Sequence, residues 1–85
     1  MKISTNHVIS SNINRIGYNG TTLYIGFNSG QPYSYVSVPY QLFLEMLKAE
    51  SVGSFFHNRI RKVFSYTKLD SDPFDEPARA PAVSE

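Results

Sequence analysis

The dipeptide Asn19-Gly20 is the feature that most constrains how this chain can fold. Both residues tolerate positive φ, which the tight turn of a two-residue β-hairpin requires at its two central positions. After this turn, every second residue is a large apolar one: Leu23, Ile25 and Phe27. Alternation with a period of two places such side chains on one face of a strand. The sequence therefore predicts a β-hairpin with strands at 13–18 and 22–27.

A third strand and two helices are predicted after the hairpin. Asn28-Ser29-Gly30 supplies a turn, and the run 32–38 then places Tyr33 and Tyr35 on one strand face. Pro39 suits the first position of a helix, and apolar residues recur with helical spacing up to Ala49. Either Ser51 or Ser54 is suited to cap a second helix. The apolar residues that this second helix is expected to bury are Phe56, Ile60, Val63 and Phe64.

The predicted fold class is α+β, with a three-stranded antiparallel meander followed by a two-helix hairpin packed on one face. A chain of 85 residues allows one domain, and without cysteine its thin core depends on the 6 Tyr and 6 Phe. We expect the domain to span 10–69, after a flexible N-terminus at 1–9 that adds a loop or a short edge strand. Residues 70–85 carry many acids and three prolines, which predicts a disordered acidic tail.

Charge is distributed unevenly along the chain. Residues 1–68 hold seven Lys and Arg against two Glu, whereas residues 69–85 hold one Arg against five Asp and Glu. A basic body favours an anionic partner. No segment has the length of apolar sequence that a membrane span or a signal peptide needs. We therefore expect a cytoplasmic protein without membrane contact, of a bacterium or of a phage that infects one.

A series of short motifs spread over some sixty residues resembles the KTSC family, named from the C-terminus of some lysyl-tRNA synthetases. The motifs are Ser11-Asn12-Ile13, Ile16-Gly17-Tyr18, Leu23-x-Ile25-x-Phe27-x-x-Gly30, Tyr33-x-Tyr35-x-x-Val38-Pro39, Ala49-x-Ser51-x-Gly53-x-Phe55-Phe56, Ile60-Arg61 and Phe64-x-Tyr66. The resemblance runs from about Ser10 to Leu69 and implies a small free-standing member. For the family, RNA binding has been suggested from its association with these synthetases.

The residue content argues against an enzyme. There is no cysteine nucleophile, and only His7 and His57 could serve as imidazole bases. Glu45 and Glu50 lie five residues apart and do not share a helix face, so paired-carboxylate chemistry is not expected. The two distant histidines and few carboxylates also predict no metal site and no cofactor.

Two groups of residues are candidates for a nucleic-acid contact. The helical segment 57–62 presents His57, Asn58, Arg59, Arg61 and Lys62, which could bind phosphates, and Arg15 would strengthen the group if it lay beside them. Tyr33 and Tyr35 could stack on bases. The alternatives are an ordinary solvated helix face for the cations and packing inside the fold for the two rings.

Three functions remain open at this stage. The leading hypothesis is a non-catalytic module that binds RNA, such as tRNA, as a monomer or a homodimer. The second is a protein-interaction or regulatory module, which would act on a host protein if a phage encodes it. Its tail offers Phe74 as the single large ring. The third is a binder of a small nucleotide-like ligand, for which a concave pocket of aromatic and basic residues would be the structural sign.

Overall fold

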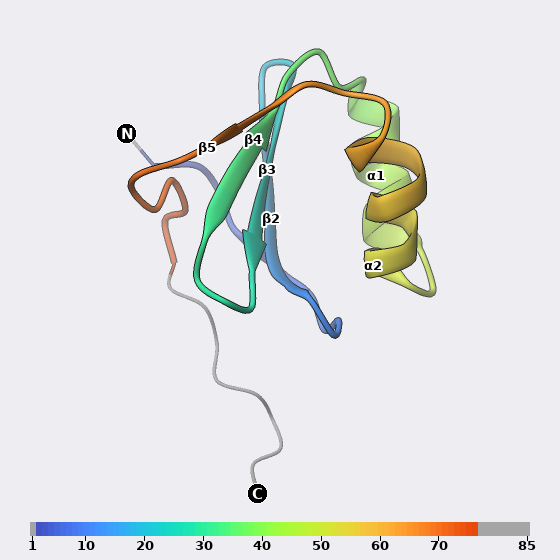
Figure 1. Ribbon diagram of the computed structural model, residues 1–85, viewed down its shortest axis with the longest axis horizontal. Coiled ribbons are helices and arrows are strands. Elements are labelled where there is room, and N and C mark those ends of the chain that lie inside the picture. Colours follow the sequence, from blue (N-terminus) through green and yellow to red (C-terminus); the bar gives the residue numbers. More distant parts are fainter. Residues whose placement is uncertain (1, 77–85) are drawn as a thin grey trace, which may run out of the picture.

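A computed structural model describes residues 2–76, and its centre is one antiparallel sheet of five strands (Figure 1). The strands are β1 (Asn6–His7), β2 (Ile13–Asn19), β3 (Thr22–Phe27), β4 (Pro32–Tyr35) and β5 (Tyr66–Lys68). They pair in chain order, so the predicted three-stranded meander forms the middle of a larger one. The α+β class is confirmed, but the prediction of three strands was wrong. The two added strands have only two and three residues, too few to show alternation.

The predicted hairpin forms, but its two-residue turn consists of Gly20 and Thr21, because Asn19 already belongs to β2. Asn19 pairs with Thr22 across the turn, and Gly20 adopts a φ of 69°. Gly30, in the next turn, has a φ of 99°. Positive φ costs glycine little because it has no Cβ, so Gly20 and Gly30 suit these two turn positions.

The helical layer covers one face of the sheet (Figure 1). It consists of α1 (Tyr40–Lys48), α2 (Val52–Phe55) and a π-helical stretch η1 (Phe56–Arg61) that continues α2. The Ser51 hydroxyl accepts a hydrogen bond from the Ser54 backbone N–H at 3.2 Å, as a capping serine does. The second helical segment ends at Arg61, and Val63 beyond it is 64% exposed, so the expectation that Val63 is buried was wrong.

The main core lies between the helices and the sheet. It contains side chains from β2, β3 and β4, the connection to α1, and the three helical segments: Ile13, Ile16, Leu23, Ile25, Tyr35, Val38, Phe43, Met46, Val52, Phe56 and Ile60. Burial of this aliphatic and aromatic surface is the main term that stabilises the fold.

The opposite face of the sheet is covered by the two terminal segments, residues 2–5 and 72–76, which we call the terminal strap. Ile3 pairs with Phe74 in a parallel bridge, and both side chains are buried. Glycines open the space beneath them: a Cβ on Gly17 would clash with Ile3, and one on Gly26 would lie 3.1 Å from the Phe74 ring. The terminal strap therefore packs closely on this face because Gly17 and Gly26 have no side chain there.

Polar contacts complete the terminal strap. The Thr5 hydroxyl donates to Asp75 Oδ1 at 2.7 Å, and Arg15 Nη1 donates to Asp72 Oδ2 at the same distance. The expected disorder from residue 70 therefore does not hold for 70–76, and the N-terminus contributes β1 and the strap. Residues 77–85 of the expected tail lie outside the described residues. No helix among the described residues is long and apolar enough to cross a membrane.

Candidate functional site

Five aromatic side chains form a closed ring of contacts on the helical side of the sheet. Successive ring centroids lie 5.3 to 5.8 Å apart, and the last ring contacts the first. In order around the ring, the members of this aromatic cluster are Phe27, Tyr33, Tyr66, Tyr35 and Phe56. Most of the contacts are edge-to-face or tilted, which is the arrangement that the ring quadrupoles favour. The cluster joins three strands to the helical layer.

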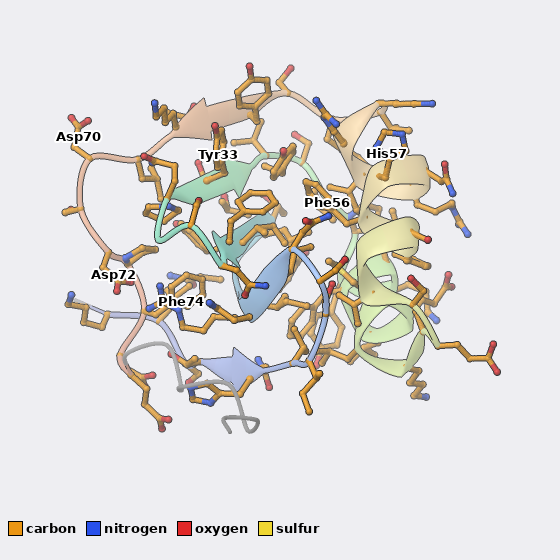
Figure 2. All side chains as sticks on the ribbon, turned by 60° about the horizontal axis from the view of Figure 1, so that its bottom comes forward. Tyr33, Phe56, His57, Asp70, Asp72 and Phe74 are labelled. Atoms are coloured by element: carbon orange, nitrogen blue, oxygen red, sulfur yellow. The ribbon has the colours of Figure 1, made fainter. Side chains whose placement is uncertain are left out.

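The aromatic cluster lines a pocket of about 550 Å³, which is within the usual size range of ligand sites. The remaining lining residues come from the segment before β2, the start of β2, the β3–β4 turn and the second helical segment. They are Ser11, Asn12, Ile13, Asn28, Ser29, Gln31, Gly53, His57 and Arg61. Among the described residues no Asp or Glu lines the pocket, so the guanidinium of Arg61 gives the described lining a positive charge. In Figure 2, Tyr33 lies over the sheet, Phe56 lies between the sheet and the helical layer, and His57 lies on the helical layer.

The cations of segment 57–62 do not act as one group. His57 and Arg61 both line the pocket, and Arg61 Nη1 lies 3.5 Å from His57 Nδ1. Arg59 instead reaches α1, where its Nη2 lies 3.8 Å from Glu45 Oε1, and its guanidinium lies over the Phe55 ring. Asn58 and Lys62 are exposed and do not line the pocket. The structure therefore divides the predicted basic flank, and only His57 and Arg61 adjoin the aromatic rings.

Comparisons with known proteins agree with this architecture. The model of the KTSC domain family matches residues 9–64, which is more than half of the chain. The chain belongs to the KTSC domain family. A KTSC domain protein of Yersinia pestis, known from a crystal structure, is 33% identical, with a TM-score of 0.73. The match covers 76% of this chain and 94% of that protein. No curated protein matches the chain significantly.

The two tyrosines predicted to stack on bases have different environments in this KTSC domain. Tyr35 is only 3% exposed and belongs to the core, whereas Tyr33 is half-buried and its neighbour Tyr66 is 61% exposed. Packing inside the fold therefore describes Tyr35, whereas a stacking role for Tyr33 stays a prediction. Tyr66 was missed as a candidate because nothing in the sequence indicated that β5 would pair with β4.

Arg15 does not join the basic flank. Its side chain is 4% exposed, lies on the sheet face opposite the helices, and packs over Phe74 at 4.6 Å from the ring centroid. Its guanidinium already donates to Asp72 and to the Glu76 carbonyl oxygen. Arg15 is therefore a structural residue of the terminal strap, because a buried guanidinium held by Asp72 on the opposite sheet face does not reach a phosphate at the pocket. Phe74 is also buried, so it does not present an exposed ring to a protein partner.

Burial raises the pKa of Tyr35 to about 12, against an opposing effect of the Arg61 charge and with added effects of Tyr33 and Tyr66. An unfolded tyrosine ionises near pH 10, so the folded state favours the neutral phenol. This contribution to stability is complete below pH 10 and is lost as the pH rises from 10 to about 12.

We expect the Tyr35→Phe variant to lose less stability between pH 10 and 12 than the parent, by about 1–3 kcal/mol. The measurement is the free energy of unfolding in urea as a function of pH. Identical alkaline profiles of the two proteins would show that Tyr35 does not couple folding to its ionisation.

The described residues contain no group of three or more His, Asp or Glu placed to hold a metal ion. The pocket instead offers aromatic rings, a guanidinium, an imidazole and several side-chain amides. This set suits a ligand that has both a planar ring and a negative charge. Asn28 and Gln31 also line the pocket. From the sequence, Asn28 was interpreted only as a turn residue and Gln31 was given no role, because no motif marks such amides as functional.

Proposed function

We propose that this KTSC domain is a non-catalytic module that binds single-stranded RNA by holding one nucleotide in the aromatic pocket. The observation that carries the proposal is the placement of Arg61 and His57 beside the aromatic cluster, in a pocket that no carboxylate of residues 2–76 lines. A base can stack on aromatic faces while its phosphate is held by a guanidinium, which is how many single-strand binders work.

Exposed residues next to the pocket support the same ligand. Tyr66 is the most exposed ring of the cluster and is accessible for stacking. Lys68 follows on β5 as the register partner of Tyr33, so a second positive charge lies on the strand that borders the pocket. A strand of RNA leaving the pocket along β5 would meet this charge. An RNA ligand agrees with the cytoplasmic location that the sequence predicts.

The test is a titration of fluorescently labelled single-stranded RNA and tRNA, followed by anisotropy at low and at moderate salt. We expect single-stranded RNA to bind and its affinity to fall with salt. Arg61→Ala is expected to weaken binding by roughly tenfold, because it removes a charge-assisted phosphate contact. Tyr66→Ala is expected to weaken it by roughly five- to tenfold through lost stacking.

The chain provides matched controls within the same segment. Arg59→Ala and Lys62→Ala remove the same charge as Arg61→Ala but lie outside the pocket, so they are expected to weaken binding by no more than about threefold. If all three variants lost affinity equally, binding would depend on general charge and not on the pocket. An absence of RNA binding at low salt would refute the proposal.

A second candidate is a free nucleotide-like ligand, favoured by the concave shape and the volume of the pocket. The same titration distinguishes the two, with a mononucleotide as competitor. A mononucleotide that displaces RNA at its own low concentration would identify the small ligand as the natural occupant. If tight binding requires longer RNA, the contacts along β5 contribute to the affinity and the proposed RNA-binding function is retained.

A further inference from the structure

Two amide side chains at the pocket have their nitrogen atoms fully engaged by the protein. Asn28 Nδ2 donates to the carbonyl oxygens of Ser10 and Ser11 at 3.1 and 3.0 Å. Gln31 Nε2 donates to the carbonyl oxygens of Pro32 and Leu69 at 2.9 and 2.8 Å. An amide nitrogen has two N–H donors, so both donors of each side chain are used.

These hydrogen bonds also fix which end of each amide is nitrogen. Only an NH₂ group can serve two carbonyl oxygens, so a flipped assignment of either amide would place acceptor against acceptor. The side-chain oxygens, Asn28 Oδ1 and Gln31 Oε1, receive no hydrogen bond from any described residue. Asn28 and Gln31 therefore each hold an acceptor oxygen in a fixed position, and both residues line the pocket together with the aromatic cluster, His57 and Arg61.

We infer that the pocket selects nucleobases that carry an exocyclic amino group, such as cytosine and adenine, over uracil. This inference rests on the proposed function and names the class of base that the same site takes. An amino group offers two N–H donors, which match the two acceptors. Uracil has one ring N–H between two carbonyl oxygens, and those oxygens would face Asn28 Oδ1 or Gln31 Oε1 without a proton between them.

The size of the selectivity follows from the energy of such contacts. Hydrogen bonds that read a base edge in a paired arrangement discriminate by about 1–3 kcal/mol, so a difference of roughly tenfold in affinity is expected. Stacking on the aromatic cluster does not distinguish the bases in this way, because every base has a π-face. Selectivity for the amino group therefore tests the contribution of Asn28 and Gln31 to binding separately from that of the aromatic cluster.

The experiment compares labelled hexanucleotides of cytidine, adenosine and uridine at one salt concentration. We expect cytidine and adenosine to bind roughly tenfold more tightly than uridine. A cytidine hexanucleotide methylated twice at N4 lacks both amino donors and is expected to bind like uridine. This substitution changes only the ligand, so no folding defect of the protein can produce the result.

Protein variants give a second readout. Asn28→Ala and Gln31→Ala should reduce the difference between cytidine and uridine, whereas Arg61→Ala should weaken both equally. Equal affinity for the cytidine, N4-dimethylcytidine and uridine hexanucleotides would overturn the inference and leave RNA binding intact. If none of the hexanucleotides binds, the proposed function fails, and the inference fails with it.

Discussion

Replacing Phe74 with alanine is expected to lower the free energy of unfolding by about 3 kcal/mol. The ring is 3% exposed, lies under the Arg15 guanidinium and pairs through its backbone with Ile3. Its removal leaves a cavity over Gly26, where the sheet has no side chain to fill the space. A loss of this size corresponds to roughly 12–24 °C in Tm for a domain of this length.

Urea denaturation followed by circular dichroism measures this effect. The matched control is Ile9→Ala, which also truncates an apolar side chain near a chain end but at a position that is 97% exposed. It should change stability by no more than about 0.5 kcal/mol. If Phe74→Ala left the urea midpoint unchanged, the terminal strap would not contribute to the stability of the sheet.

Asp72→Ala is expected to destabilise the protein by about 2 kcal/mol. The substitution leaves the buried Arg15 guanidinium without its carboxylate, although the Glu76 carbonyl oxygen and Asn14 still accept from it. Asp72 is itself about half exposed, which reduces the cost below that of a fully buried pair. In a double-mutant cycle with Arg15→Met, the second change should recover part of the loss, since no unpaired charge then remains.

The ionisation of the Asp72 carboxyl also makes the stability of the terminal strap depend on pH. Burial by itself would raise the pKa of Asp72, but hydrogen bonds from Arg15 and the Phe74 N–H, with the charges of Arg15 and Lys2, hold it below the usual 3.8. Because the folded pKa is depressed, its contribution is present above pH 3.8 and is lost as the pH falls below that value. Asp72→Ala should therefore flatten part of the acid limb of the stability curve. An unchanged acid limb would contradict the assignment.

The candidate site shows which features a local sequence pattern can predict and which it cannot. The segment 57–62 was identified as basic from its composition, and two of its members do line the pocket. The sequence could not predict that these two are His57 and Arg61. That outcome depends on where η1 lies over the sheet and on the contact between Arg59 and Glu45. Arg15 was wrongly placed with the basic flank for a related reason. The sequence around a strand residue does not indicate which face of the sheet a carboxylate far away in the chain will cover.

Local sequence patterns predicted the hairpin turn that contains Gly20, a serine cap at position 51 or 54, the apolar stripe of α1 and the α+β class. These features depend on turn geometry, capping and periodicity, which involve residues only a few positions apart. β5, the terminal strap and the pocket depend instead on contacts between distant parts of the chain. Each of these joins segments separated by thirty to seventy residues, as the hydrogen bonds between Gln31 and Leu69 and between Thr5 and Asp75 show. Such pairings are fixed by packing of the whole chain, and the short segments that make them carry no periodic pattern of their own.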